Sequence, residues 1–244
     1  MNYKITIQYD GTKYDGWQRQ KNTENTIQGK IERILSRMTD APVEIDGAGR
    51  TDAGVHALGQ TASFRLWEQY DALEVKAYLN RYLPEDIEVV SCVRASERFH
   101  ARLNARGKIY RYQIGMNSAK NVFYRRYRYG IDETLDLDAM RIAASYCVGK
   151  HDFKSFCGNR RMKKSTIRNI WSIDFYQDGD EVYITYHGDG FLNHMIRIMT
   201  GTFIEVGMGK RKAEELPAII EGKDRELAGF LAPARGLTLV EVEY

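Results

Sequence analysis

Two stretches near the start of the chain decide the fold class: YKITIQY, residues 3–9, and TIQGKIERILSRM, residues 26–38. Apolar residues fall at every second position of the first stretch, namely Tyr3, Ile5, Ile7 and Tyr9. This alternation predicts a half-buried strand. The second stretch repeats apolar residues at helical spacing, namely Ile27, Ile31, Ile34, Leu35 and Met38. Asn25 or Thr26 could cap its start, so a strand followed by an amphipathic helix is expected.

Similar patterns continue through residue 93. Short strands are expected at 43–48 and 61–66, and a further strand at 87–93. A helix is expected at about 71–82, with Val75, Leu79 and Tyr82 facing inward and Pro84 ending it. The resulting order, β-α-β-β-α-β, is that of the split β-α-β arrangement in ferredoxin-like folds.

The second half of the chain is also expected to combine strands and helices. Strands are expected at 108–114, 124–129 and 237–242, and a long hairpin at 165–188 around the turn QDGD. Helices are expected at 137–148, ended by Gly149, at 191–206 and near 212–220. The inward residues of the long helix would be Phe191, Met195, Ile198, Met199 and Phe203. We therefore predict an α+β protein of two similar ferredoxin-like or RRM-like halves, 1–103 and 104–244, with mostly antiparallel sheets joined around a central cleft.

Length and composition are those of an ordinary globular protein: 244 residues, 43% hydrophobic and 28% charged. They allow one or two domains. No apolar run approaches the roughly 20 residues that a membrane span needs, and the N-terminus enters a strand pattern directly, unlike a secretory signal. The three cysteines, Cys92, Cys147 and Cys157, show no C-x-x-C spacing. Reduced thiols, and hence a cytoplasmic protein, are expected.

Basic residues are concentrated in two segments, although the net charge is only +3. From Arg98 to Arg128 there are nine Lys and Arg and no Asp or Glu, with aromatic residues interleaved. The second segment, GNRRMKKSTIR at 158–168, contains Arg160, Arg161, Lys163 and Lys164. A single cluster would more often be a solvated face of the fold. Two clusters with aromatic residues favour a surface that binds nucleic acid.

Several common chemistries have no motif in this chain. The sequence contains no P-loop and no G-x-S-x-G nucleophile motif, and GAGRTDAG lacks the strand-to-helix context of a dinucleotide site. The five histidines are never three or four residues apart, which argues against a metal site. We therefore expect neither a metal nor a small-molecule cofactor.

The segment GAGRTDAGVHA, residues 47–57, places Arg50 and Asp52 among glycine, alanine and small polar residues. One interpretation is a carboxylate on a tight loop that a substrate can approach closely. The alternative is that Asp52 only caps a turn or a helix, as Asp in such loops commonly does. Residue type alone favours the second interpretation, whereas the longer motif favours the first.

GAGRTDAGVHA resembles the signature segment of the tRNA pseudouridine synthase A family. KIYRY at 108–112 and GDGFLNHMIR at 188–197 are similar to the family's second and third motifs. YDGTKYDGWQRQ at 9–20, followed by TIQGKIE at 26–32, resembles its opening. These pieces span most of the chain in the family's order. The resemblance implies an isomerase that converts uridine to pseudouridine in the anticodon stem-loop of tRNA, at tRNA positions 38–40.

The resemblance also implies roles for individual residues. Asp52 matches the catalytic aspartate, and Arg197 matches the arginine that pairs with it. Tyr110 matches the tyrosine that stacks on the target uracil. Arg50 matches the arginine that enters the RNA and fills the space left by the flipped base. The resemblance further implies a homodimer that holds one tRNA arm. The charge clusters, rather than the resemblance, predict that Arg160, Arg161, Lys163 and Lys164 contact the tRNA backbone.

The residues alone leave alternatives open. Tyr110 in an alternating strand could line a sheet core, and Arg197 could be a surface residue of an amphipathic helix. A non-catalytic RRM-like RNA-binding protein would explain the basic and aromatic residues, but not the motif at 47–57. A glycosidase-like enzyme would need a second carboxylate, for which Asp46 and Asp189 are weaker candidates. Whether a catalytic Asp52 attacks C1′ or C6, or removes a ribose proton, is left open as well.

Overall fold

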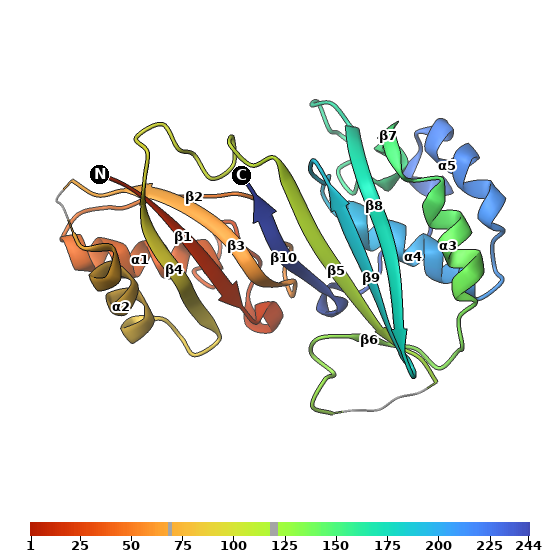
Figure 1. Ribbon diagram of the computed structural model, residues 1–244, viewed down its shortest axis with the longest axis horizontal. Coiled ribbons are helices and arrows are strands. Elements are labelled where there is room, and N and C mark those ends of the chain that lie inside the picture. The colour runs from red at the N-terminus through yellow and green to blue at the C-terminus, as the bar shows by residue number, and fades with distance from the viewer. Residues whose placement is uncertain (68–69, 118–121) are drawn as a thin grey trace. The chain divides into compact units, whose positions relative to one another are not determined.

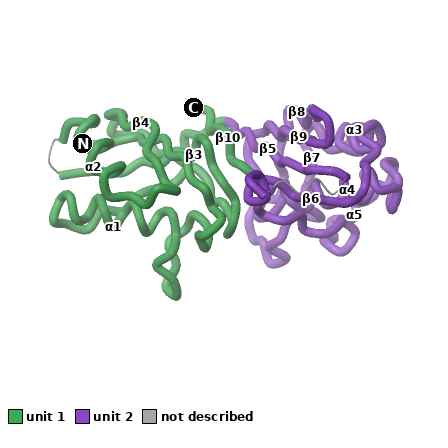
Figure 2. The backbone as a smooth tube through the Cα atoms, turned by 90° about the horizontal axis from the view of Figure 1, so that it is seen from below, with its two compact units in different colours: residues 1–106, 238–244 green, residues 107–237 purple. Residues whose placement is uncertain are grey.

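The computed structural model describes residues 1–67, 70–117 and 122–244 (Figure 1). Residues 1–106 and 238–244 form one compact unit, and residues 107–237 form another (Figure 2). We call them unit 1 and unit 2. The described residues combine α-helices with mostly antiparallel strands. At this level the predicted fold class is confirmed.

Unit 1 contains a mostly antiparallel sheet with two helices on one face (Figure 1). Its elements in chain order are β1 (Asn2–Tyr9), the 3-10 turn η1 (Gly11–Lys13), α1 (Ile27–Thr39), β2 (Ile45–Gly47), β3 (His56–Arg65), α2 (Ala72–Tyr82), β4 (Ile87–Ala95) and β10 (Leu237–Glu243). β1 lies between β3 and β4 and is antiparallel to both, and β2 pairs with β3. β10 joins β3 in parallel. The predicted order β-α-β-β-α-β is confirmed for residues 2–95.

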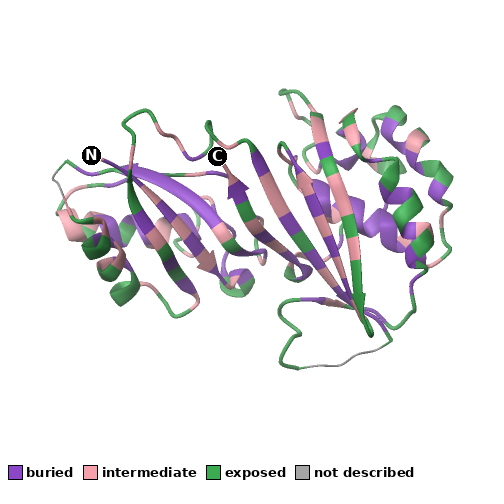
Figure 3. Cartoon of the chain, in the orientation of Figure 1, coloured by how far each residue is buried: buried purple, intermediate pink, exposed green. Residues whose placement is uncertain are grey.

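The strand and helix that open the chain supply much of the core of unit 1. All four apolar residues of β1 are buried, and the residues between them are half-buried (Figure 3): Tyr3, Ile5, Ile7 and Tyr9. The Thr26 hydroxyl caps α1 by accepting a hydrogen bond from the Gly29 backbone N–H at 3.2 Å. The apolar stripe of α1 is also buried, with only Met38 half-buried. Full burial of each such side chain stabilises the folded state by about 1.5–3 kcal/mol relative to leaving it exposed.

In unit 2 the strands follow the order β5-β9-β8-β7, with α3 and α4 packed against one face of them (Figure 1). Its strands are β5 (Gly107–Gly115), β6 (Tyr129–Gly130), β7 (Gly149–Asp152), β8 (Ile167–Asp178) and β9 (Glu181–Gly188). Its helices are α3 (Leu137–Ser145), α4 (Met195–Gly207) and α5 (Leu216–Gly222), with 3-10 turns η2 (Lys154–Phe156), η3 (Ala213–Glu215), η4 (Arg225–Leu227) and η5 (Ala234–Gly236). β6 runs parallel to β5, and β8 and β9 form the predicted hairpin.

The strand predicted at 124–129 is wrong for all but its last residue. Residues 122–127 form turns, and only Tyr129 enters a strand, the two-residue β6. Arg and Tyr alternate over residues 126–129 of this segment, which is a partial period of two. However, an alternating pattern produces a half-buried strand only where one face is covered, and here Phe123 and Tyr124 are 85% and 55% exposed.

Other differences concern the limits of elements. α4 begins at Met195 rather than at Phe191, because His194 has a left-handed backbone with φ of 61° that interrupts the helical path. α3 ends at Ser145 rather than at Val148. Tyr82, expected to face inward from α2, is 41% exposed. β7 was not predicted, since its sequence GKHD contains no apolar alternation.

Candidate active site

The segment between β2 and β3 carries Arg50 and Asp52. Asp52 is half-buried, Arg50 is exposed, and Thr51 between them is buried. The chain turns tightly after Asp52: the Val55 N–H donates to the Asp52 carbonyl oxygen at 3.1 Å. Gly54 within this turn has a φ of 78°, a left-handed conformation that favours glycine. Asp52 therefore lies on a tight, partly solvent-accessible turn.

Buried hydrogen bonds anchor this loop beside Asp52. The Thr51 carbonyl oxygen accepts a hydrogen bond from the Trp17 backbone N–H at 3.0 Å. The Thr51 hydroxyl lies 2.8 Å from the Tyr9 hydroxyl at the end of β1. Burial raises the pKa of Tyr9, so this hydroxyl stays neutral. Thr51 is held through both its backbone and its side chain, which restricts the position of the next residue, Asp52.

Close packing accounts for two of the small residues around the loop. A Cβ atom on Gly47 would lie 2.4 Å from Nε1 of Trp17. A Cβ atom on Gly16 would lie 2.7 Å from the Thr51 carbonyl oxygen, and Gly16 also has a φ of 95°. Glycine is required at both positions because the loop packs directly on the segment that contains Trp17.

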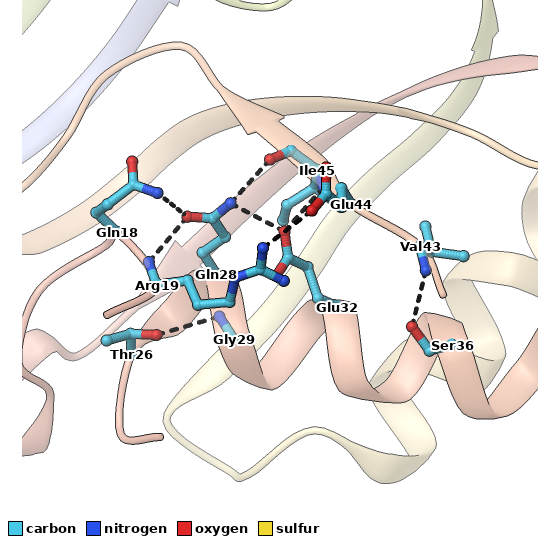
Figure 4. Close-up of polar contacts among 10 residues, drawn as sticks. All are labelled: Gln18, Arg19, Thr26, Gln28, Gly29, Glu32, Ser36, Val43, Glu44 and Ile45. Carbon is cyan, nitrogen blue, oxygen red and sulfur yellow. Dashed lines mark hydrogen bonds and ion pairs between the residues drawn. The ribbon is translucent and has the colours of Figure 1, made fainter. Parts of the chain in front are cut away.

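A polar cluster beneath β2 supports the start of the loop (Figure 4). Glu32, on α1 and 4% exposed, accepts hydrogen bonds from the Ile45 backbone N–H at 3.0 Å and from Gln28 Nε2 at 2.9 Å. Gln28 Nε2 also donates to the Ile45 carbonyl oxygen at 3.0 Å. Arg19 pairs with the Glu32 carboxylate at 2.9 Å, and its backbone N–H donates to Gln28 Oε1 at 2.9 Å. The cluster thus joins α1, the segment after Trp17 and the first residue of β2.

Sequence reasoning missed this cluster. Gln28 and Glu32 are four residues apart, so they share a face of α1, and that face adjoins the apolar stripe. A carboxylate and an amide next to an apolar stripe could have indicated a buried polar contact, because such groups require partners when they leave water. Their partners, however, come from segments that the helical pattern does not identify.

Tyr110 lies in β5 of unit 2 and is buried, with 7% of its surface exposed. Its ring meets the ring of Phe191 edge to face, with centroids 5.4 Å apart and an angle of 84°. Across the sheet its partner in register is Tyr186 of β9. Tyr110 is therefore held among aromatic residues on the buried side of β5.

Arg197 lies in the first turn of α4 and is half-buried. Its Nε donates a hydrogen bond to the Ala232 carbonyl oxygen at 2.8 Å, and the Ala232 N–H donates to the Arg197 carbonyl oxygen at 3.1 Å. Because the guanidinium group is planar, a fixed Nε also fixes the directions of its two terminal nitrogens. Segment 229–233 thereby orients the Arg197 side chain.

Further contacts hold segment 229–233 on α4. The Gly229 N–H donates to Thr202 Oγ1 at 2.9 Å, and the Phe230 N–H donates to Glu205 Oε1 at 3.1 Å. The Phe230 carbonyl group lies directly over Gly201, where an added Cβ atom would be only 1.9 Å from the Phe230 oxygen. The close approach of this segment therefore depends on a glycine in the middle of α4.

The basic residues of the second cluster are all exposed, between η2 and β8: Arg160, Arg161, Lys163 and Lys164. Arg160 forms an ion pair with Glu226 of η4. The Gly158 N–H donates to the Asn193 carbonyl oxygen at 2.9 Å. This bond joins the beginning of the basic segment, residues 158–168, to the residues just before α4, the helix that carries Arg197.

The predicted site residues are divided between the two units. Arg50 and Asp52 belong to unit 1, whereas Tyr110, Arg197 and the basic cluster belong to unit 2. Within unit 2, Arg197 lies in the first turn of α4, and Gly158 at the start of the basic segment is bonded to Asn193 just before that helix. The pairing of Asp52 with Arg197 stays a prediction.

Thiol nucleophiles are disfavoured at two of the three cysteines. Burial raises the pKa of Cys92 to about 11 and that of Cys147 to about 12, so both are protonated at neutral pH. Over residues 1–67, 70–117 and 122–244, no three His, Cys, Asp or Glu side chains are grouped as metal ligands. None of the helices in that part of the chain has the length and apolar character needed to cross a membrane.

Comparison with known proteins gives full-length matches. The model of the family described as tRNA pseudouridine synthase matches residues 5–103 and 143–244, which include Arg50, Asp52 and Arg197. The chain is 48% identical over 243 residues to tRNA pseudouridine synthase A of a Bacillus species (strain KSM-64), covering 100% of this chain and 99% of that protein. It is 44% identical to tRNA pseudouridine synthase A 2 of Bacillus cereus and 43% identical to tRNA pseudouridine synthase A of Acetivibrio thermocellus, with the same coverage.

Similarity of this extent to enzymes named for pseudouridine synthesis in tRNA defines the class of this protein as an RNA-modifying isomerase. The chain belongs to the tRNA pseudouridine synthase family, which confirms the resemblance predicted from its motifs.

Proposed function

We propose that this protein converts uridine to pseudouridine in the anticodon stem-loop of tRNA, with Asp52 as the catalytic carboxylate. The observation that carries the proposal is the position of Asp52. It lies on a partly accessible turn anchored through Thr51, inside a segment that matches the family model. A carboxylate that must meet one atom of a nucleotide has to be held in place, and these contacts do so.

The reaction needs little beyond a positioned carboxylate. The N1–C1′ bond of uridine breaks, the base turns, and a C5–C1′ bond forms. The hydrogen on C5 is lost to water and N1 gains a proton, so substrate and product have the same atoms and no electrons are exchanged. Asp52 acts as nucleophile or base in this sequence, on a uridine flipped out of its stack.

Three other residues complete the proposed site. Arg197 pairs with Asp52, and its orientation by Ala232 supports this role. Tyr110 stacks on the target uracil, and its fixed position in β5 beside Phe191 is suited to holding an unstacked base. Arg50, exposed on the same loop as Asp52, enters the RNA and occupies the space of the flipped base.

The finer description of the fold is part of this proposal. An N-terminal ferredoxin-like half carries the aspartate loop, and a similar C-terminal half carries Tyr110 and Arg197. The strand order β4-β1-β3-β2 of unit 1, with its two helices, supports the description of the first half. The resemblance further suggests a homodimer that acts in the cytoplasm.

Wild-type protein is expected to release tritium from unmodified tRNA transcripts that contain uridine labelled at C5, because closing the C5–C1′ bond displaces that hydrogen. The modified nucleosides should then be found in the anticodon stem-loop after nuclease digestion. Binding without tritium release would instead support the non-catalytic RNA-binding protein. Release of free uracil would support the glycosidase-like enzyme.

Tyr110→Phe should retain most of the tRNA affinity, since the ring is kept, whereas Tyr110→Ala should weaken tRNA binding by about 1–3 kcal/mol through the lost stacking. Tyr110 is buried, so Ala also leaves a cavity, and the unfolding free energy of both variants should be measured by urea titration. A folded Tyr110→Ala protein with normal affinity and turnover would show that this ring does not contact the substrate.

A further inference from the structure

An open pocket of about 230 Å³ lies in unit 2 beside the start of α4. It is lined by three basic side chains, one carboxylate and two apolar side chains: Arg160, His194, Arg225, Glu226, Ile198 and Leu231. These residues come from three separate parts of unit 2: the loop after η2, α4 with the residue before it, and the region from η4 to residue 231. Its volume is several times the roughly 30 Å³ that one water molecule occupies, so a phosphodiester group fits.

Close contacts fix the walls of this pocket. A Cβ atom on Gly158 would lie 2.4 Å from Nδ1 of His194, so the His194 ring packs directly on this glycine. His194 also has the left-handed backbone that ends the preceding loop. Nη1 of Arg225 donates to the Ala228 carbonyl oxygen at 3.2 Å. Two of the basic groups are thereby held in place before a ligand arrives, which lowers the entropic cost of binding.

The charges in the pocket suit an anion that can replace a carboxylate. Arg160 is paired with Glu226, and their side chains are 70% and 67% exposed. An ion pair so exposed contributes little to stability and exchanges readily with solvent. A phosphate oxygen can take the place of Glu226 on the Arg160 guanidinium, and the phosphate can also meet Arg225, which lines the same pocket. Arginine is well suited to such contacts because its donors are arranged as a planar fork.

The pocket and Arg197 share two structural elements. His194 and Ile198 are within one helical turn of Arg197, a rise of about 5 Å or less. Leu231 precedes Ala232, whose carbonyl oxygen accepts the hydrogen bond from Arg197 Nε. A nucleotide held near Arg197 would therefore have a neighbouring backbone phosphate within reach of the pocket.

We propose that this pocket is a phosphate subsite that binds one backbone phosphate of the tRNA next to the target uridine, with Glu226 as the group that the phosphate displaces. The inference rests on the proposed function, since Arg197 marks the position of the target nucleotide. It assigns to RNA binding three residues outside the basic cluster, His194, Arg225 and Glu226.

Two charge-neutralising variants should have opposite effects on binding to tRNA. Arg225→Gln should lower the affinity by about tenfold, the lower end of the range for a hydrogen bond to a charged group. It should also reduce the slope of log affinity against log salt by about 0.7–0.9, the value for one phosphate contact. Glu226→Gln should raise the affinity, because it removes the competing carboxylate.

An exposed ion pair elsewhere in unit 2 provides a matched control. Arg141 pairs with Asp138 on α3 at 2.7 Å, with side chains 47% and 89% exposed. Arg141→Gln and Asp138→Asn change the net charge by the same amounts as the pocket variants. They should leave the salt slope unchanged. If the control variants shift the affinity and the salt slope as much as the pocket variants do, general electrostatic attraction explains the effects. The proposal of a phosphate subsite is then wrong.

A phosphate scan of a synthetic anticodon stem-loop gives the decisive test. Methylphosphonates, which are uncharged, replace the phosphates around the target uridine one at a time. One replacement should weaken binding to wild-type protein and have almost no further effect in Arg225→Gln, because the same contact is already lost. If every replacement weakens binding equally, and the loss adds to that caused by Arg225→Gln, the proposal of a phosphate subsite is contradicted. Tritium release by wild-type protein is measured in parallel, so failure of the proposed function is recognised separately.

Discussion

Asp52→Asn is expected to abolish pseudouridine formation while the protein still folds and binds tRNA. Asn has nearly the same shape as Asp, and the backbone contacts of Thr51 and Val55 that hold the loop do not involve the carboxylate. The amide, however, is neither a nucleophile nor a base of useful strength, so the N1–C1′ bond should stay intact. Loss of a single catalytic carboxylate typically lowers the rate by about 10⁴-fold or more. The affinity for tRNA should not fall, because a negative charge near a polyanion has been removed.

The measurement is single-turnover tritium release with enzyme in excess over labelled tRNA, together with a binding titration. Asp52→Glu restores the charge but moves the carboxylate by one methylene group, a displacement that can cost on the order of 100-fold. Asp46→Asn is the matched control, because Asp46 lies in β2 of the same unit and its side chain is 67% exposed beside His100. It should retain normal turnover. Substantial product from Asp52→Asn would rule out Asp52 as the catalytic group.

Gly201→Ala is expected to destabilise the protein by about 2 kcal/mol, although Ala is the better helix former by about 1 kcal/mol. The added Cβ atom would lie 1.9 Å from the Phe230 carbonyl oxygen and 2.8 Å from its carbon. These are backbone atoms, so the overlap can be relieved only if segment 229–233 moves off α4. That movement breaks the hydrogen bonds to Thr202 and Arg197, each worth about 0.5–1.5 kcal/mol, and adds the strain of overpacking.

The same displacement should lower the single-turnover rate about tenfold or more, because Arg197 loses the carbonyl group that orients its guanidinium. Urea unfolding measures the stability, and an unchanged m-value would show that the denatured state is unaffected. Gly130→Ala is the control, since a Cβ atom there meets no atom within 4 Å. A Gly201→Ala protein as stable and active as Gly130→Ala would show that segment 229–233 does not depend on close contact with α4.

Local sequence patterns were sufficient to identify buried residues in elements where one face is covered along the whole length. The alternation in β1 and the stripe of α1 correctly identified buried residues, because each pattern reports a single face covered along its whole length. The same reasoning failed at 124–129, where the alternation covers only residues 126–129 and the side chains of Tyr124 and Tyr127 are exposed. It also placed the start of α4 too early, since the left-handed backbone of His194 leaves no periodic signal.

The candidate site shows the same division. The motifs alone identified the family and the candidate residues Asp52, Tyr110 and Arg197. They did not identify the partners in the polar cluster around Glu32, because those partners come from segments far apart in the chain. Nor could they indicate which basic residues line a pocket with Glu226.

The sequence by itself determined the order of strands and helices in the first half, the family and the set of candidate site residues. Periodicity and short motifs depend on neighbours along the chain, so they can be read without a structure. Only the tertiary structure decided why Gly47 and Gly201 must be glycine, which carbonyl group orients Arg197, and which charged residues line the pocket beside α4. These features depend on distances between atoms of segments that are remote in sequence, and folding alone brings those segments together.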